Sequence, residues 1–456
     1  MSSEPEDECE TMDKKLLTIL IIAFLLRALI FSSIALGNQN AIYDPDSDGY
    51  TVMGKALSKG DFLLQSPEAK QASLFRVAGY PAFLGIFYSI GLNDLAIAGV
   101  QLLLDFANIY LIYLITKKYF EGRKESEKIA YVAAALYAIS PLFVSFFFKI
   151  LTESLFTTVF LLAIYYFVND KKNTSSILLG ILILIKPVAI FYPIVFAIYN
   201  YLKTKNRRQS IEIAMIALAI SSIWLVRNFI VLDKITYSAI STVNYVCWNG
   251  VYLANDVGLD NPEWKDFIKE NKLSSFEECQ RRPLEELEAL TPKINTFVLA
   301  NPLLYAKQYV KGAITFFVPT TPNNLLKTVG REQEAVSLTY IYLKKGFDIG
   351  FLLDYLSKNS FYAVILTLSV IYTLGLYALF ISGLKKLYQM KNYALIFLVI
   401  TLILYNIVAV GPVANYRFRI PVEPLIILVA ASAFLVDVKM AKVKLNGLNL
   451  SGLFHQ

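Results

Sequence analysis

The chain has 456 residues, of which 56% are hydrophobic and 17% are charged, and it carries a net charge of +7. Its mean hydropathy is +0.51. These values exclude an ordinary soluble domain and are typical of a multi-spanning membrane protein. The basic residues lie in short clusters at the ends of apolar segments, which is the pattern of topology control and argues against a nucleic-acid partner. The single histidine, His455, is penultimate, which excludes a histidine base, a Ser-His-Asp triad and a multi-histidine metal site.

The apolar segments predict an all-α fold with about ten transmembrane helices and with helices along the outer membrane surface. Residues 1–15 form an acidic cytoplasmic tail, and Leu16–Leu36 is an uncleaved first span. The first outer loop, 37–94, contains an amphipathic segment and the short apolar Ala78–Leu92, which we place along the interface. The later spans are predicted at Leu95–Thr116, Ile129–Phe148, Ser154–Val168, Ser175–Ile185, Val188–Leu202, Ile211–Leu232, Phe361–Ile381, Ala394–Val410 and Ile420–Val436.

This topology predicts four parts. After the tail come a transmembrane catalytic module at 16–232, an extracytoplasmic region at 233–360, and C-terminal transmembrane helices with a cytoplasmic tail at 361–456. The cysteines Cys9, Cys247 and Cys279 show no CxxC spacing, so free thiols are favoured. Pairing of Cys247 with Cys279 within the outer region is left open.

Three carboxylates, Asp44, Asp46 and Asp48, directly follow the first span. They form either a solvated turn, as Asp-Pro and Asp-Gly often do, or a site at the membrane surface. The predicted topology brings further polar residues to the same outer side, and these are Arg76, Lys149, Glu153, Lys186, Arg227, Asn228, Arg417 and Arg419. Such a mixture suits a reaction in which a base takes a proton from an acceptor while cations hold a phosphate leaving group.

Each of these residues also has a structural interpretation. Arg76, Arg417 and Arg419 fit anchors at the lipid headgroups, as does Lys149, and Glu153 fits a helix N-terminus. Asp105 beside Asn108 fits interhelical contacts, and Arg27 is expected to pair within the bundle. No phosphate-binding loop, nucleophile elbow or dinucleotide fingerprint occurs, so energy must come from the substrate or from a gradient.

Six short motifs resemble the polytopic lipid-linked-sugar glycosyltransferases of the GT-C superfamily, in the branch of dolichyl-phosphate-mannose protein mannosyltransferases and the lipid A aminoarabinose transferase (glycosyltransferase family 39-like). In chain order the motifs are Asp46-Ser47-Asp48-Gly49-Tyr50, Arg76-Val77-Ala78-Gly79-Tyr80-Pro81, Leu151-Thr152-Glu153, Gly180 with Ile185-Lys186-Pro187, Trp224-Leu225-Val226-Arg227-Asn228, and Tyr416-Arg417-Phe418-Arg419-Ile420-Pro421. Two departures are Lys186 in place of arginine and Ala78 in place of proline.

The resemblance implies an inverting transfer of a sugar from a polyprenyl-phosphate donor to a lipid, glycan or protein acceptor at the outer or lumenal face of the membrane, most simply the plasma membrane. It implies catalytic carboxylates at Asp46, Asp48 and Glu153, with Asp46 as the favoured base. It implies donor-phosphate binding by Lys186, Arg227, Arg417 and Arg76, and substrate positioning by Tyr50, Tyr80 and Asn228. The sugar and the acceptor are left open.

Two other classes of function are weighed. A lipid-linked glycan polymerase or ligase needs the same outer cations, whereas a secondary transporter favours charges at the midplane and a repeated half, which we do not find. No cofactor is assigned. A divalent metal, Mg²⁺ or Mn²⁺, is left open because Asp46, Asp48 and Glu153 carry hard oxygen ligands.

Overall fold

The computed structural model describes residues 14–248, 262–271, 273, 275, 278–279, 282–334 and 349–435. Cys9, His455, most of the predicted N-terminal tail and the predicted C-terminal tail lie outside the described residues. Every regular element within the described ranges is helical, which confirms the predicted all-α class.

The first half of the chain forms the helices of the predicted catalytic module. They are α1 (Lys14–Leu36), α2 (Ser47–Ser58), α3 (Pro67–Phe75), α4 (Gly79–Ser89), α5 (Asp94–Tyr119), α6 (Ser126–Ala138), α7 (Pro141–Phe146), α8 (Glu153–Val168), α9 (Lys172–Ile185), α10 (Tyr192–Thr204) and α11 (Arg207–Leu232). Short 3₁₀ turns, η1 (Gln39–Ile42) and η2 (Pro187–Phe191), precede α2 and α10.

The second half adds outer helices and then returns to the bundle. Its elements are α12 (Ile240–Val243), η3 (Asn244–Trp248), α14 (Pro262–Glu270), α16 (Leu284–Ala300), α17 (Pro302–Phe317), α18 (Asn323–Thr328), η4 (Glu332–Glu334), α20 (Ile349–Lys358), α21 (Ser360–Gln389), α22 (Tyr393–Val410), η5 (Gly411–Val413), η6 (Tyr416–Arg419), α23 (Glu423–Ala431) and η7 (Ser432–Phe434).

Prolines set several helix boundaries near the candidate site. The predicted span Ile129–Phe148 is divided into α6 and α7, because Ser140 is extended before Pro141 and Pro141 then starts a new helix. Lys186 is likewise extended (φ −150°, ψ 114°) before Pro187, which ends α9. The chain therefore changes direction at Lys186, and the side chain is presented at a helix end.

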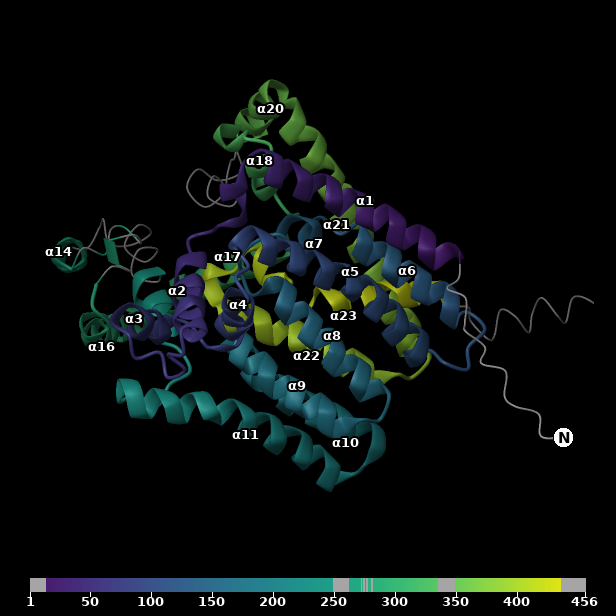
Figure 1. Cartoon of the computed structure of the whole chain (residues 1–456), viewed down its shortest axis with the longest axis horizontal. Coiled ribbons are helices and arrows are strands. Elements are labelled where there is room, and N and C mark those ends of the chain that lie inside the picture. The colour runs from purple at the N-terminus through teal and green to yellow at the C-terminus, as the bar shows by residue number, and fades with distance from the viewer. Residues whose placement is uncertain are drawn as a thin grey trace, which may run out of the picture.

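The helices pack side by side in one bundle (Figure 1). Helix α5 packs against α6 and α8, and the row continues from α8 through α9 to α11. Helix α23 packs between α21 and α6, while α22 contacts α10. The short helices α2, α3, α14 and α16 gather at one end of this bundle.

Six helical stretches are long and apolar enough to cross a membrane. They are Lys14–Leu36, Asp94–Tyr119, Ser126–Phe146, Arg207–Leu232, Ser360–Gln389 and Tyr393–Val413. Shorter apolar helices lie at Glu153–Val168, Lys172–Ile185 and Glu423–Phe434. An integral membrane protein is therefore supported, and the number of ten crossings stays a prediction.

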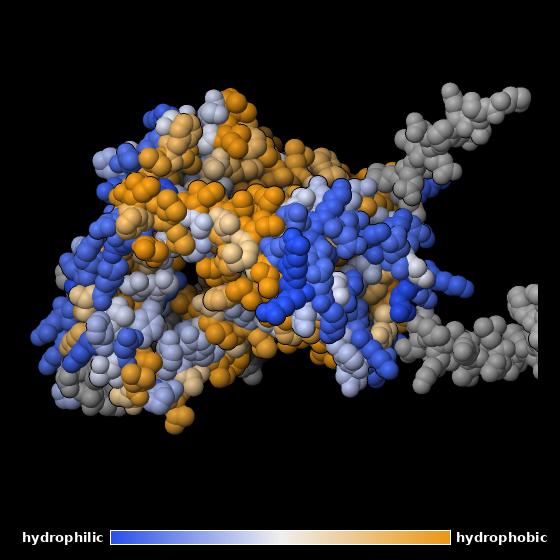
Figure 2. Space-filling view, turned by 90° about the horizontal axis from the view of Figure 1, so that it is seen from below, coloured by the Kyte–Doolittle hydropathy of each residue, from blue (hydrophilic) through white to orange (hydrophobic). Residues whose placement is uncertain are grey.

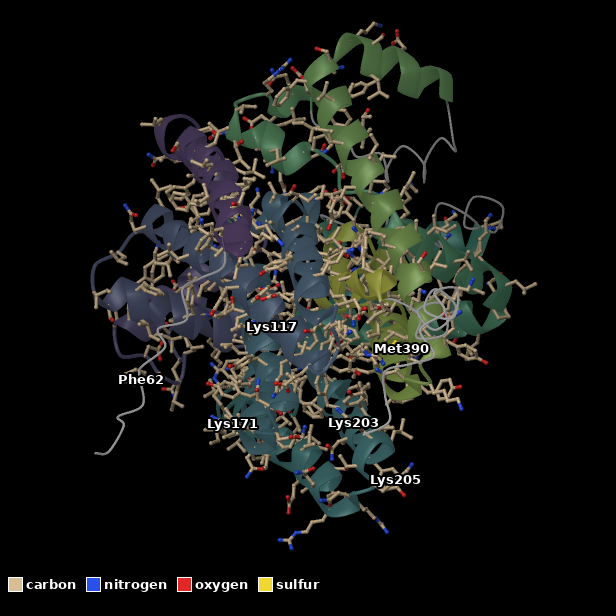
Figure 3. The ribbon with its side chains drawn as sticks, turned by 90° about the vertical axis from the view of Figure 1, so that its right-hand side faces the viewer. Phe62, Lys117, Lys171, Lys203, Lys205 and Met390 are labelled. Atoms are coloured by element: carbon tan, nitrogen blue, oxygen red, sulfur yellow. A yellow bond between two sulfur atoms is a disulfide. The ribbon has the colours of Figure 1, made fainter. Side chains whose placement is uncertain are left out.

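The two ends of the bundle differ in character. Figure 3 views the molecule from the end that carries Lys117, Lys171, Lys203 and Lys205, and the outer helices α2 and α3 lie at the opposite end. Figure 2 shows an orange apolar band between hydrophilic surfaces at the two ends. The lysine-rich end is the one that the sequence predicts to be cytoplasmic, because positive charge marks that side.

Inside the bundle, Arg27 pairs with Asp105, a partner that the sequence analysis did not name. Its Nε lies 2.5 Å from an Asp105 carboxylate oxygen, and Tyr137 donates to the other oxygen at 2.9 Å. Arg27 Nη1 also donates to the Ala138 carbonyl. These contacts join α1, α5 and α6, so Asp105 makes the interhelical contacts that we predicted for it.

The prediction of free thiols is wrong for two of the three cysteines. Cys247 and Cys279 form a disulfide with their Cα atoms 5.6 Å apart. Both are fully buried, in a small hydrophobic cluster with Val246, Leu287 and Ile294. The absence of CxxC spacing was uninformative here because the pairing is made by tertiary packing of η3 against the outer helices.

Candidate active site

The base predicted from sequence, Asp46, lies between two arginines from distant parts of the chain. It is the residue before α2, and its carboxylate oxygens accept hydrogen bonds from Arg76 Nη2 at 2.7 Å and Arg417 Nη1 at 3.1 Å. Arg76 ends α3 and Arg417 belongs to η6. The Asp46 side chain keeps 35% of its surface exposed, so it remains reachable by a substrate.

Glu153 lies on the other side of Arg417. One of its oxygens accepts from Arg417 Nε at 2.7 Å and from Lys186 Nζ at 3.2 Å. Its side chain is only 2% exposed, in contrast with Asp46. Glu153 begins α8, where the helix N-terminus adds further stabilisation of negative charge.

These five residues form one continuous cluster of ion pairs. In order of contact they are Arg76, Asp46, Arg417, Glu153 and Lys186. Three cations face two carboxylates, so the cluster has an excess of one positive charge. We call it the Arg417 cluster.

Two motif glycines allow the close packing that positions Lys186. A Cβ on Gly79, at the start of α4, would lie 2.6 Å from the carbonyl oxygen of Leu184, two residues before Lys186. A Cβ on Gly180 would lie 2.7 Å from the Ala217 carbonyl oxygen of α11. Contacts this short are not tolerated, so any larger residue would push the end of α9 away from its neighbours. The Ala78 departure leaves the turn intact, because Ala78 has helical angles (φ −76°, ψ −17°) that proline would also adopt.

The charge state of Asp46 follows from its neighbours. Burial alone would raise the pKa of Asp46, but the nearby guanidinium groups of Arg76 and Arg417 outweigh burial and hold the pKa below its ordinary value. Asp46 is therefore ionised at neutral pH and is able to accept a proton.

A second group of ion pairs adjoins the Arg417 cluster. Lys149 Nζ lies 3.2 Å from an Asp44 oxygen, and Lys327 Nζ lies 3.6 Å from the same oxygen. Lys149 is completely buried, and its ammonium group also approaches the Tyr43 carbonyl at 3.5 Å. We call these three residues the Asp44 cluster, in which two cations share one carboxylate.

The remaining members of the first outer loop differ in their surroundings. Asp48 is exposed in the first turn of α2, and no ion pair is recorded for its side chain. Tyr50 is buried, packs edge-on against Tyr80 and lies under the Arg76 guanidinium at 5.3 Å. Tyr80 donates to Gln101 at 2.7 Å, and Gln101 in turn donates to the Lys149 carbonyl at 2.7 Å. Tyr50 thus packs against Arg76, and Tyr80 holds the 149–152 loop through Gln101.

Arg227 is not brought into the Arg417 cluster. Its five N–H donors are used by the Leu63 and Leu64 carbonyls, the Ser73 hydroxyl and the Asn228 side-chain carbonyl, at distances of 2.7–2.9 Å. Its guanidinium also stacks over Trp224 at 4.7 Å. The donor-phosphate role predicted for Arg227 would require these bonds to break, and the contacts instead favour a role in holding the first outer loop. Asn228 donates to the Thr236 carbonyl and is equally occupied.

Sequence reasoning missed one residue of the site and set another aside. Lys327 lies on α18 in the outer region, in a short polar segment without a recognisable motif. Lys149 was interpreted as an anchor, yet its burial and pairing place it inside the site. By contrast, Arg419 is fully buried against Glu423 at 2.7 Å and against carbonyls of α17, which is a structural arrangement.

The carboxylates of the site do not fit a metal ion. Within the described ranges no group of three or more His, Cys, Asp or Glu side chains could hold one. Asp46 and Glu153 are also compensated by three cations, and a divalent ion would add to the positive excess.

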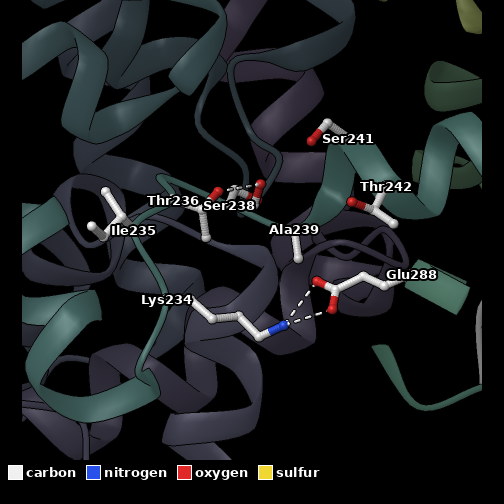
Figure 4. Close-up of a pocket in the computed structure, with 8 residues that line it drawn as sticks. All are labelled: Lys234, Ile235, Thr236, Ser238, Ala239, Ser241, Thr242 and Glu288. Atoms are coloured by element: carbon white, nitrogen blue, oxygen red, sulfur yellow. Dashed lines mark hydrogen bonds and ion pairs between the residues drawn. The ribbon is translucent and has the colours of Figure 1, made fainter. Parts of the chain in front are cut away.

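A separate polar pocket of about 260 Å³ lies in the outer region (Figure 4). Lys234 contacts both carboxylate oxygens of Glu288 there at 2.8 and 2.9 Å, beside hydroxyls of Ser241 and Thr242. Lys234 is matched one-to-one with Glu288, so this pocket lacks the positive excess of the two clusters.

One family of known proteins matches part of the chain. Residues 78–230, about a third of the chain, match the family described as dolichyl-phosphate-mannose-protein mannosyltransferase. The matched stretch contains Glu153 and Lys186 of the Arg417 cluster, and it confirms the resemblance seen in the short motifs. The match supports membership of the GT-C superfamily and indicates a membrane glycosyltransferase.

One solved structure is similar at a lower level. It is the archaeal oligosaccharyltransferase AglB from Archaeoglobus fulgidus in complex with an inhibitory peptide and a dolichol-phosphate, with 14% identity and a TM-score of 0.47. The similarity covers 97% of this chain and 52% of the solved one, so this chain spans about half the length of that protein. A similarity of this size carries no argument about function. No curated protein matches the chain significantly in sequence.

Proposed function

We propose that the protein is an inverting glycosyltransferase that moves a sugar from a polyprenyl-phosphate-linked donor to an acceptor hydroxyl or amide at the outer face of the membrane. The carrying observation is the Arg417 cluster, in which an ionised, reachable Asp46 shares Arg417 with Glu153 and Lys186. It supplies the two things that this reaction needs, which are a positioned base and charge compensation for a phosphate leaving group.

The transfer is a single displacement. Asp46 accepts the proton of the acceptor as the acceptor atom attacks the anomeric carbon from the face opposite the phosphate. A bond from that carbon to the acceptor forms, the bond from the carbon to the phosphate oxygen breaks, and the electron pair leaves with the polyprenyl phosphate. Arg417 and Lys186 stabilise the charge that develops on that phosphate.

Donor binding also activates the base in this proposal. Arg76 and Arg417 depress the pKa of Asp46, which makes the carboxylate a weak base. A donor phosphate competes with Asp46 for Arg417. Once Arg417 turns to the phosphate, Asp46 loses one of its two cations, its pKa rises, and its basicity increases at the moment when the donor is present.

The direct test replaces the base in purified full-length protein supplied with a lipid-linked sugar. Asp46→Asn should lower turnover by about 10²–10⁴-fold, because an amide cannot take the proton. Asp354→Asn removes an exposed carboxylate on α20 that pairs with Lys358, and it serves as the matched control. Turnover by Asp46→Asn equal to that of the control would remove the proposed base.

The same assay separates the two carboxylates that the sequence left as candidates. Asp48 is exposed and outside the ion-pair cluster, so Asp48→Asn should retain most of the activity. A larger loss in Asp48→Asn than in Asp46→Asn would transfer the role of base to Asp48. Analysis of the anomeric configuration of the product tests inversion independently.

A further inference from the structure

In the described part of the chain, the Asp44 cluster places two lysines on one carboxylate, which gives it an excess of one positive charge. Lys149 is 0% exposed and Asp44 is 14% exposed, whereas Lys327 keeps 35% of its side chain exposed, and within the described ranges Asp44 is the carboxylate that pairs with both lysines. Two cations that share one largely buried carboxylate are not fully balanced, so a further anion that reaches Lys327 would be stabilised there.

The two clusters are held next to each other. Asp44 and Asp46 are two residues apart, so their Cα atoms are separated by about 7 Å at most. The backbone N–H of Ile150 donates to the Ile42 carbonyl at 2.9 Å, which fixes the 149–153 loop against η1. Lys149 and Glu153, one from each cluster, are carried on that same loop. Arg417 is close enough to influence Lys149 electrostatically.

The second lysine is also fixed in place. Helix α18 is held by Asn38, which donates to the Lys327 carbonyl at 2.9 Å, and by Asn324, which donates to the Ser145 carbonyl at 3.2 Å. Lys327 is therefore positioned by the fold, and its side chain retains 35% exposure. Through the contact of Lys327 with Asp44, the region 233–360 contributes a side chain to the site.

Charge matching shows that one phosphate does not use the Asp44 cluster. The Arg417 cluster has an excess of +1 and a phosphate diester carries −1. During transfer Asp46 gains the proton while the leaving phosphate gains one negative charge, so the Arg417 cluster and a single phosphate stay balanced throughout. The +1 excess of the Asp44 cluster then needs a second anion.

We propose that the Asp44 cluster binds a second phosphate, so that the lipid-linked donor is a polyprenyl diphosphate sugar. This inference rests on the proposed function and specifies its donor. The sugar-linked phosphate lies at the Arg417 cluster and the lipid-linked phosphate lies at Lys149 and Lys327. Each phosphate of such a donor carries −1, which matches the +1 excess of each cluster.

The ionisation of Lys149 is consistent with this assignment. Burial lowers the pKa of Lys149 to about 8, although Asp44 opposes this effect, and Lys327 and Arg417 add to the lowering. A bound phosphate would favour the charged form of Lys149. Binding at this cluster should therefore weaken as the pH rises above about 8.

The test compares two sugar-free lipids of equal chain length, polyprenyl monophosphate and polyprenyl diphosphate, for binding to the full-length protein in lipid nanodiscs. The wild type should prefer the diphosphate by roughly tenfold or more, because two charge-assisted contacts are added. Lys327→Gln and Lys149→Met should each weaken diphosphate binding more than monophosphate binding, because the monophosphate can still bind at the Arg417 cluster, and should therefore reduce this preference toward unity. Lys186→Met should weaken both lipids together.

Lys234→Gln is the matched control, since Lys234 is an outer lysine paired one-to-one with Glu288 away from both clusters. Lys327→Gln keeps the test valid even if replacement of the buried Lys149 prevents folding. Equal binding of the two lipids by the wild type, with Lys186 needed for both, would overturn the diphosphate assignment and leave the proposed function standing. Binding of neither lipid would overturn both.

Discussion

Arg417 and Arg227 both lie at the end of the bundle that carries α2 and α3, and their motifs predict the same role for both. Arg417 is bonded to two carboxylates, Asp46 and Glu153. Arg227 is bonded to main-chain carbonyls and neutral side chains. An arginine held by carboxylates within a positively charged group can exchange one partner for a phosphate, whereas an arginine that uses all five donors on the fold holds the fold in place.

The loop held by Arg227 needs such support. Leu64 has a positive φ of 53°, which is an uncommon backbone conformation for a bulky residue. Arg227 binds the carbonyls of Leu63 and Leu64 at this point and also reaches Ser73 on α3. It therefore stabilises the loop that leads to Arg76, and it contributes to the site indirectly.

The largest expected effect is the loss of turnover when Arg417 is replaced. Arg417→Ala should lower kcat/KM by about 10²–10³-fold, because the phosphate loses its main donor and Asp46 and Glu153 lose their shared cation. Arg208→Ala, at the opposite end of the bundle and 91% exposed, is the arginine control. A loss at Arg417 no greater than at Arg208 would remove the distinction between Arg417 and Arg227.

The next effect is on pH dependence. Because the folded pKa of Asp46 is lowered without donor, kcat/KM should stay level as pH falls to about 4 and should decline only below the ordinary Asp pKa. If donor binding removes Arg417 from Asp46, the acid limb of kcat should lie at higher pH than that of kcat/KM. Coincident limbs in full pH–rate profiles would contradict the exchange of partners.

Replacement of Arg227 should lower the stability of the protein more than its binding of the lipid phosphate. Arg227→Met keeps the stacking volume over Trp224 but removes five hydrogen bonds, and it should lower the unfolding free energy by about 3 kcal/mol. Polyprenyl phosphate binding by the protein that remains folded should change by less than about threefold. Unaltered thermal unfolding together with abolished lipid binding would restore the direct phosphate role predicted from the sequence.

The smallest effect concerns Lys186. Lys186→Arg should strengthen lipid phosphate binding by about two- to fivefold, since a guanidinium can bind the phosphate through two parallel N–H bonds. The Lys186 side chain is 17% exposed, and its Nζ lies 5.8 Å from the centre of the Phe418 ring. Weaker binding in titrations with the arginine variant would indicate that the compact ammonium group is required.

The helices were largely predictable because apolar length and proline position are local properties. The segments around Leu16–Leu36 and Ile211–Leu232 became α1 and α11 with small changes at the ends. The predicted span at Ile129–Phe148 was divided because Pro141 imposes an extended residue before it. Local information was sufficient in both cases.

The site was predictable only in part, since its contacts join residues far apart in the chain. The sequence favoured Asp46 from its spacing to Tyr50, but the choice over Asp48 depends on which side of the first turn of α2 faces Arg76 and Arg417. Lys327 belongs to no motif, and its role follows only from the way α18 is held against η1 and α7. Arg227 sits in a motif, yet no pattern of letters tells whether its partners are carboxylates or carbonyls.

The disulfide between Cys247 and Cys279 links the orientation of the protein to the redox conditions on each side of the membrane. Glutathione and thioredoxin keep such pairs reduced in the cytosol, whereas they persist in the periplasm, in the secretory lumen or at the cell surface. A copy inserted in the opposite orientation would expose the Cys247–Cys279 disulfide to cytosolic reductants. The reduced thiols would then react with a thiol-reactive polymer, which would change the mobility of the protein on a gel. A covalent cross-link between Cys247 and Cys279 is thus in keeping with the extracytoplasmic location that the sequence predicts for residues 233–360.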